Sequence, residues 1–118
     1  MGMEQRQFGA TGLMLPCLSV GTAALGRPAY LNLDHAAEIT DASVKGMLEL
    51  THDVLDAAYA AGIRHFDTAR SYGLAEGFVS SWLGERAHSD VVVTSKWGYR
   101  YVGDWKAGYT ARGEGLEC

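Results

Sequence analysis

The chain has 118 residues and a formal net charge of −4, with an isoelectric point near 5.4, so clustered basic residues for nucleic acid or anionic membranes are not expected. Hydrophobic residues make up 47% and charged residues 20%, which is typical of an ordinary folded domain and excludes disordered, collagen-like and coiled-coil chains. Two cysteines imply no disulfide framework, and no apolar run approaches the ~20 residues of a membrane span, so we expect a cytoplasmic protein.

The first predicted element is a short β-hairpin over residues 6–16. Gly9 and Gly12 lie three apart around Thr11, with apolar residues on both sides, as in a tight hairpin. Residues 17–22 form a short, mostly apolar run, which predicts a fully buried parallel strand. Periodicity is then lost from Ala23 to Asp41, and this predicts a long loop.

Two helices and two more strands are predicted after this loop. Asp41 or Ser43 caps the first helix, and Gly62 ends it. Strands are predicted over residues 63–66 and 90–95, because both runs are short and the second is rich in β-branched residues. The helical spacing of apolar residues predicts the buried faces of the helices: Met47, Leu50, Val54, Ala57, Ala58 and Ala61 in the first, and Ala75, Phe78, Val79, Trp82 and Leu83 in the second.

Alternation of strands and helices predicts an α/β fold with a parallel sheet. A doubly wound nucleotide-binding sheet is less favoured, because the turn from Gly21 to Gly26 is followed by Arg27 and Pro28 and no GxGxxG is present. We therefore predict a (β/α)8 TIM-barrel type, with an N-terminal hairpin and about three βα units, so that the barrel is incomplete in this chain. Residues 1–106 are predicted to form the barrel part.

The tail over residues 107–118 is predicted to be irregular. Glycines punctuate the chain from Gly103 onward without helical or strand periodicity. One hypothesis is that this tail is non-native sequence, as in a truncated or frameshifted product. An incomplete barrel has unpaired strand edges, so we also expect marginal stability and self-association of the isolated chain.

Three polar residues fall where a barrel places its active site, at the carboxyl ends of the strands. Asp67 directly follows the second predicted strand, Tyr72 lies five residues later, and Lys96 directly follows the third strand. A phenol is a sluggish acid near neutral pH, but a neighbouring ammonium stabilises the phenolate and lowers the pKa of the phenol. We therefore expect proton donation by Tyr72, with Lys96 held by Asp67. Taken singly, each residue is more often structural, and only their joint placement favours this hypothesis.

Other candidates carry less weight. No histidine has metal-ligand spacing, so no metal site is predicted, and His65 is interpreted as a structural histidine. Arg27, Lys45 and Arg86 are interpreted as solvated charges. Arg64 is interpreted as an ion-pairing residue at the barrel exterior or a strand edge.

The chain resembles the aldo-keto reductases. The resemblance is carried by residues 62–73 (GIRHFDTARSYG), Glu76 and residues 94–98 (TSKWG), and it extends from about Arg6 to Tyr101 except in the loop after Thr22. It implies a barrel reductase that uses NADPH, or NADH, without a doubly wound domain. Asp67, Tyr72 and Lys96 match the catalytic positions. The family's fourth catalytic residue is a histidine at the end of the fourth strand, and no histidine follows Lys96 in this sequence.

The resemblance also implies roles in binding. Gly21, Thr22 and Asp67 would lie near the nicotinamide ribose of the cofactor. Trp97 would line the substrate pocket, although a buried barrel aromatic is the more common role of a large aromatic residue.

The expected function is NAD(P)H-dependent reduction of an aldehyde or ketone, or oxidation of the matching alcohol, with the chain inactive on its own. One alternative is a non-catalytic fragment that pairs with barrel segments or with itself through strand edges. A weaker alternative is another TIM-barrel enzyme in which Lys96 forms a Schiff base.

Overall fold

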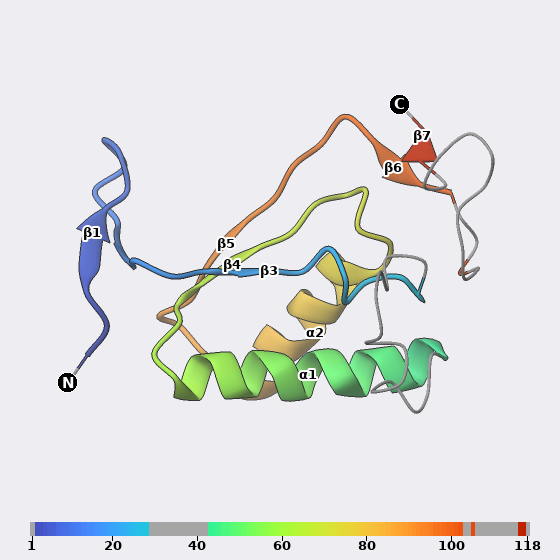
Figure 1. The fold of residues 1–118 in the computed structure, drawn as a ribbon, viewed down its shortest axis with the longest axis horizontal. Coiled ribbons are helices and arrows are strands. Elements are labelled where there is room, and N and C mark those ends of the chain that lie inside the picture. The colour runs from blue at the N-terminus through green and yellow to red at the C-terminus, as the bar shows by residue number, and fades with distance from the viewer. Residues whose placement is uncertain (1, 29–42, 103–104, 106–115, 118) are drawn as a thin grey trace.

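A computed structural model describes residues 2–28, 43–102, 105 and 116–117. Two helices lie on one side of a three-stranded sheet, with a hairpin at one end of the strands and a second pair of strands near the other end (Figure 1). None of the described helices is long and apolar enough to cross a membrane. The described residues contain no cluster of three or more His, Cys, Asp or Glu side chains that could hold a metal ion.

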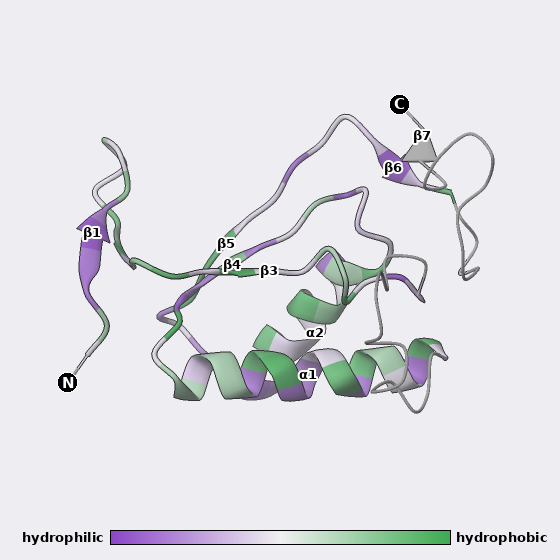
Figure 2. Cartoon of the chain, in the orientation of Figure 1, coloured by the Kyte–Doolittle hydropathy of each residue, from purple (hydrophilic) through white to green (hydrophobic). Residues whose placement is uncertain are grey.

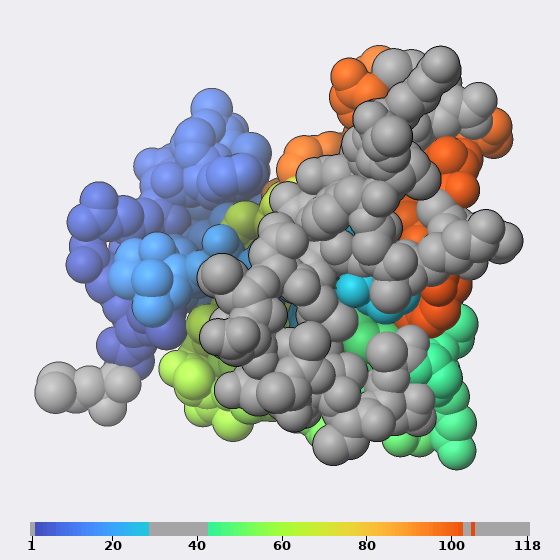
Figure 3. All heavy atoms as spheres, turned by 45° about the vertical axis from the view of Figure 1, so that its right-hand side comes forward, coloured from blue at the N-terminus to red at the C-terminus, as the bar shows by residue number. Residues whose placement is uncertain are grey.

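The predicted hairpin is confirmed. Strand β1 (Gln5–Gln7) pairs antiparallel with β2 (Met14–Pro16), and the turn is closed by a 2.8 Å hydrogen bond from Phe8 N to Leu13 O. Gly9 and Gly12 have φ angles of +55° and +79°, which other residues rarely adopt. Strand β1 is hydrophilic throughout (Figure 2), and the hairpin stands out to the side of the other elements (Figure 3).

The central sheet is parallel, as predicted, and its strand order is β3-β4-β5. Its strands are β3 (Val20–Gly21), β4 (His65–Asp67) and β5 (Val92–Thr94). The prediction that residues 17–22 form a fully buried strand is wrong, because the strand has two residues and Leu18 is exposed. The physical reason is that the described helices cover only one face of the sheet (Figure 1).

Helix α1 (Val44–Ala60) begins at Ser43, whose side chain accepts a hydrogen bond from Gly46 N. Its buried face is turned by about one residue from the predicted one: Ala57 and Ala61 are exposed, whereas Leu55 is fully buried. The reason is that α1 packs against both the sheet and α2, so polar side chains that meet α2 join the buried stripe. Its buried residues are Gly46, Met47, Thr51, His52, Leu55 and Ala58.

Helix α2 (Ala75–Arg86) buries the face that its spacing predicts, with Leu83 at the half-buried margin. The helix ends at Ala87, which has a left-handed φ of 54°. Trp82 is fully buried, and its ring lies edge-on to Phe66 of β4 with 5.2 Å between ring centroids. Leu55 and Val79 complete this contact, so the core lies between the two helices and the sheet.

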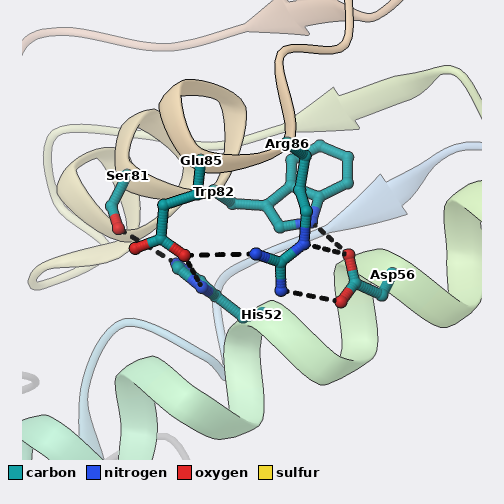
Figure 4. A network of polar contacts seen from close by, with 6 residues as sticks. All are labelled: His52, Asp56, Ser81, Trp82, Glu85 and Arg86. Atoms are coloured by element: carbon teal, nitrogen blue, oxygen red, sulfur yellow. Dashed lines mark hydrogen bonds and ion pairs between the residues drawn. The ribbon is translucent and has the colours of Figure 1, made fainter.

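A polar network joins the two helices (Figure 4). Asp56 of α1 accepts a 2.8 Å hydrogen bond from the indole nitrogen of Trp82 and is bound through both oxygens by Arg86. Arg86 is exposed, as expected of a solvated charge, but its guanidinium is also shared between Asp56 and Glu85. His52 completes the network, with Ser81 3.1 Å from Nε2 and Glu85 3.4 Å from Nδ1.

Arg27 is buried, so its interpretation as a solvated charge is wrong. Only 1% of its surface is exposed, and its guanidinium lies 5.7 Å from the centroid of the Tyr101 ring. The segment after β3 runs under the loop that follows β4, where Leu74 N donates to Gly26 O at 2.7 Å. This close packing buries Arg27. The rest of the predicted loop, residues 29–41, lies outside the described residues.

Strands β6 (Arg100–Tyr101) and β7 (Leu116–Glu117) form an antiparallel pair. Strand β7 lies in the segment 107–118 that the sequence predicts to be irregular. The other residues of that segment lie outside the described part of the chain.

Candidate active site

The three parallel strands end at one level. In the register of the sheet, Gly21 of β3 is opposite Asp67 of β4, and Asp67 is opposite Thr94 of β5. Hydrogen bonds continue beyond these pairs, from Thr22 N to Asp67 O at 3.0 Å and from Thr68 N to Thr94 O at 2.8 Å. The residues that follow the strands are therefore held beside one another, at the end of the sheet away from the hairpin (Figure 1).

The structure brings together the three residues predicted from the sequence. The Lys96 ammonium donates to Asp67 Oδ2 at 2.6 Å and to the carbonyl oxygen of Thr68 at 2.9 Å. The same nitrogen lies 4.9 Å from the centroid of the Tyr72 ring. Lys96 therefore lies between a carboxylate and a phenol, and half of its side chain (51%) remains exposed.

The Asp67–Lys96 pair is stable as an ion pair. Burial alone would raise the pKa of Asp67, but hydrogen bonds from Lys96 and Thr94, together with the electrostatic effects of Lys96 and His65, outweigh it. The pKa of Asp67 therefore lies below its usual value. The hydrogen bond to Asp67 raises the pKa of Lys96. Near neutral pH Asp67 is therefore a carboxylate and Lys96 an ammonium.

Two residues that the sequence did not link to the site lie on the other side of Asp67, and one of them binds it directly. Thr94 donates from its hydroxyl to Asp67 Oδ1 at 2.7 Å, and His65 Nε2 lies 2.9 Å from the same hydroxyl. The sequence does carry a signal that could have linked them to the site. Side chains alternate along a strand, so His65 and Asp67 point to the same face, and parallel pairing places Thr94 beside them.

Tight backbone packing fixes the loop that carries Tyr72. Tyr72 N donates to Ala69 O, and Tyr72 O accepts from Ala75 N, both at 3.0 Å. A Cβ atom on Gly26 would lie only 1.8 Å from Tyr72 O, and one on Gly73 would lie 2.2 Å from Gly26 O. Gly73 also has a φ of +60°. The two glycines let the segments meet, and this contact sets the position of the Tyr72 backbone.

The loop that carries Lys96 is held from the helical side. Ser95 donates a short hydrogen bond to Glu76 in the first turn of α2. Arg70 N donates to Lys96 O at 3.0 Å. The Ser95 side chain and the Lys96 backbone are thus both tied to neighbouring segments.

The residues expected to contact a cofactor or substrate lie at the same end of the sheet. Thr22 is fully buried, and both its amide and its hydroxyl donate to Asp67 O. Gly21 is exposed, and none of the atoms of the described residues would lie within 4 Å of a Cβ placed there. Packing therefore does not require this glycine, which leaves room for a ligand beside Asp67. Trp97 is 91% exposed, so the interpretation as a buried barrel aromatic is wrong for this structure.

Comparisons with known proteins identify the family of the chain. Residues 17–114 match the model of the aldo/keto reductase family, a range that runs past residue 106. A curated relative, D-threo-aldose 1-dehydrogenase of a Pseudomonas species, is 35% identical over 100 residues, which are 83% of this chain and 26% of the relative.

Solved structures give the same answer for the fold. Two structures from Pseudomonas aeruginosa, both described as aldo-keto reductases, are 31% identical to the chain, with TM-scores of 0.59 and 0.58. Each match covers 81% of this chain, but 34% and 32% of the respective solved chains. The chain therefore spans about a third or less of the proteins that it matches. With the parallel βα units, the N-terminal hairpin and the family match over residues 17–114, the chain belongs to the aldo/keto reductase family.

Proposed function

We propose that this chain supplies the proton-donating part of an NAD(P)H-dependent aldo-keto reductase, with Tyr72 as the general acid. The observation that carries the proposal is the position of the Lys96 ammonium, 2.6 Å from Asp67 and 4.9 Å from the centre of the Tyr72 ring. A cation in this position stabilises the phenolate that remains when the phenol gives up its proton.

Each of the three side chains has a separate task in the proposed reaction. Tyr72 donates a proton to the carbonyl oxygen of the substrate, and in the reverse direction its phenolate takes the hydroxyl proton of an alcohol. Lys96 holds the negative charge that develops on the phenol oxygen. Asp67 fixes the Lys96 ammonium and does not itself transfer a proton, since its pKa is below the usual value.

The cofactor supplies the hydride that the carbonyl carbon receives. Gly21 and Asp67 are proposed to lie against its nicotinamide ribose, because Gly21 leaves open space beside the Asp67 carboxylate. Thr22 supports this surface from below through its two bonds to Asp67 O. Trp97, exposed directly after Lys96, is proposed to form a wall of the substrate pocket.

Aldehydes, ketones and sugars are the substrates to test. The curated relative is named D-threo-aldose 1-dehydrogenase, which supports including aldoses with NADP+ and NAD+ beside simple aldehydes with NADPH and NADH. Because the chain spans 26% of that relative, binding of the cofactor is measured separately from turnover.

The experiment combines a fluorescence titration of NADPH with a turnover assay. We expect saturable NADPH binding by the chain, which is expected to be inactive on its own. Where turnover is measurable, Tyr72→Phe should lower it about 100-fold or more, because general acid catalysis contributes factors of that size. Tyr59→Phe is the matched control. It removes the same hydroxyl from α1, where that group donates to Asp90 at 2.8 Å, and turnover should stay unchanged. Equal and measurable turnover of Tyr72→Phe and the wild-type chain, or the absence of NADPH binding, would overturn the proposal.

A second candidate function is association through strand edges without catalysis. Within the described residues, β3 and β5 are paired on one side only, and Val93 of β5 is 38% exposed. Val93→Lys should then reduce a concentration-dependent increase in mass measured by light scattering. Val44→Lys is the control, since Val44 is similarly exposed but lies on α1. Saturable NADPH binding together with a constant monomer mass would contradict this candidate.

A further inference from the structure

The Asp67 carboxylate has two oxygens, and the proposed reaction uses only the one that binds Lys96. Its other oxygen, Oδ1, accepts a 2.7 Å hydrogen bond from the Thr94 hydroxyl. His65 Nε2 lies 2.9 Å from that hydroxyl oxygen, and Lys96 lies 2.6 Å from Oδ2. His65, Thr94, Asp67 and Lys96 thus form a continuous row of hydrogen bonds.

The direction of each bond in this row follows from counting protons. A threonine hydroxyl carries one hydrogen, and an ionised carboxylate can only accept. Because Asp67 is paired with an ammonium, the Thr94 hydrogen has to point toward Asp67. The hydroxyl oxygen can then only accept from His65, so His65 carries a proton on Nε2.

We propose that Thr94 and His65 are positioning residues, which hold the Asp67 carboxylate in the orientation that binds the Lys96 ammonium beside Tyr72. The inference rests on the function proposed above for Tyr72 and Lys96. Without Thr94, the Asp67 side chain has one hydrogen-bond partner among the described side chains, and rotation of the carboxylate would move Lys96 relative to the phenol.

Packing around His65 supports its role in the row. The Phe8 ring of the hairpin lies 6.0 Å from the His65 ring, and residues of the hairpin line a cavity of about 240 Å³ with His65. The Phe8 ring therefore lies beside the imidazole, and the hydrogen bond to Thr94 is the polar contact that sets its orientation. The titratable groups that act on Asp67 are Lys96, which follows β5, and His65, which lies on β4 as Asp67 does.

The first test examines the hydrogen bonds of this row by NMR and needs no catalytic assay. Nitrogen NMR of the chain should show a proton on Nε2 of His65, and carbon NMR should follow the titration of the Asp67 carboxyl group. In Thr94→Val, which keeps the shape of the side chain but lacks the hydroxyl, we expect the pKa of Asp67 to rise toward its usual value and the His65 nitrogen shifts to change. Thr94→Ser restores the hydroxyl and should restore both signals.

A second pair of variants tests His65 in the same way. Gln can present a donor near the position of Nε2, whereas Leu cannot, so His65→Gln should keep the Asp67 titration closer to that of the wild-type chain than His65→Leu does. The proposal is overturned if Nε2 of His65 carries no proton, or if Thr94→Val leaves the titration of Asp67 unchanged while the chain stays folded.

Turnover separates this inference from the function on which it rests. We expect Thr94→Val to lower kcat about tenfold with little change in KM, which corresponds to the loss of one hydrogen bond to a charged group. Thr94→Ser should keep most of the activity. Absence of both NADPH binding and cofactor-dependent turnover in the wild-type chain would count against the proposed function, whereas an unchanged kcat in Thr94→Val, where turnover is measurable, would count against the positioning role.

Discussion

Two clusters of charge, one between the helices and one at the strand ends, are built from the same kinds of group but completed differently. Between the helices, Asp56 is bound through both oxygens by Arg86 and also receives the Trp82 indole N–H (Figure 4). At the strand ends, Asp67 also receives two partners, Lys96 and Thr94. The cations differ, because the Arg86 guanidinium is shared by two carboxylates, whereas Lys96 binds one carboxylate and faces an aromatic ring.

Under the proposed function, the same kind of ion pair serves structure between the helices and chemistry at the strand ends. The partners of the interhelical cluster satisfy one another and join α1 to α2 beside the core. The strand-end cluster holds an ammonium against a phenol whose proton can be transferred. Substitutions should therefore reduce stability mainly in the first cluster and activity mainly in the second.

The largest expected effect is that of Trp82→Ala. This side chain is fully buried and packs against Phe66, so its removal should lower the free energy of unfolding by about 3–5 kcal/mol in urea denaturation. Trp82→Phe keeps a ring but loses the indole donor to Asp56, and it should cost less. Equal stability of Trp82→Ala and the wild-type chain would show that the contact between the helices does not hold the core.

Gly26→Ala should come next and should affect both stability and the site. Its Cβ would lie 1.8 Å from Tyr72 O, a backbone atom, so the two loops would have to separate, at a cost of about 1–3 kcal/mol. Gly84→Ala is the matched control. That position is helical and open, so the substitution should stabilise the chain by roughly 0.5–1 kcal/mol. The midpoint temperature of thermal unfolding should therefore fall in Gly26→Ala and rise in Gly84→Ala.

Asp67→Asn should have a small effect on stability. The pair with Lys96 is partly exposed, and such pairs contribute within about 1 kcal/mol. The same variant should strongly reduce any cofactor-dependent turnover, because the amide cannot hold the ammonium as the carboxylate does. If circular dichroism shows that Asp67→Asn unfolds, the loss of activity would follow from unfolding alone. That result would contradict the distinction between the two clusters.

Acidification should have the smallest effect, and it should weaken both clusters. Hydrogen bonds from Arg86 and Trp82 lower the pKa of Asp56, and the pKa of Asp67 is lowered as well. A carboxyl group with a lowered folded-state pKa contributes stability above its unfolded-state pKa of about 4, and this stability is lost as the pH falls through the folded-state value. Urea midpoints should therefore decrease below about pH 4, and they should decrease less in the Asp56→Asn variant.

The sequence predicted the elements of this fold better than it predicted their burial. The hairpin follows from two glycines and the second helical face from apolar spacing, because both are local patterns. The burial of Arg27 depends on contact between two loops far apart in the chain. The buried face of α1 differs from the predicted one because the polar side chain of His52 meets α2. Neither can be read from periodicity.

The candidate site shows the same limit. Asp67, Tyr72 and Lys96 were found because each follows a predicted strand, and their proximity follows from parallel pairing. Thr94 and His65 were not linked to the site, since the hydrogen bonds that join them to Asp67 depend on the strand register and on side-chain rotamers.

The central claim is that the Lys96 ammonium lies against the phenol of Tyr72, and an NMR measurement of proximity tests it most directly. Because Lys96 Nζ lies 4.9 Å from the ring centroid, cross-relaxation should be observed between the ring protons of Tyr72 and the terminal methylene of Lys96. The stacked rings of Tyr59 and His88, with centroids 3.6 Å apart, provide an internal reference. Cross-relaxation at the reference pair but none between Tyr72 and Lys96 would contradict the account.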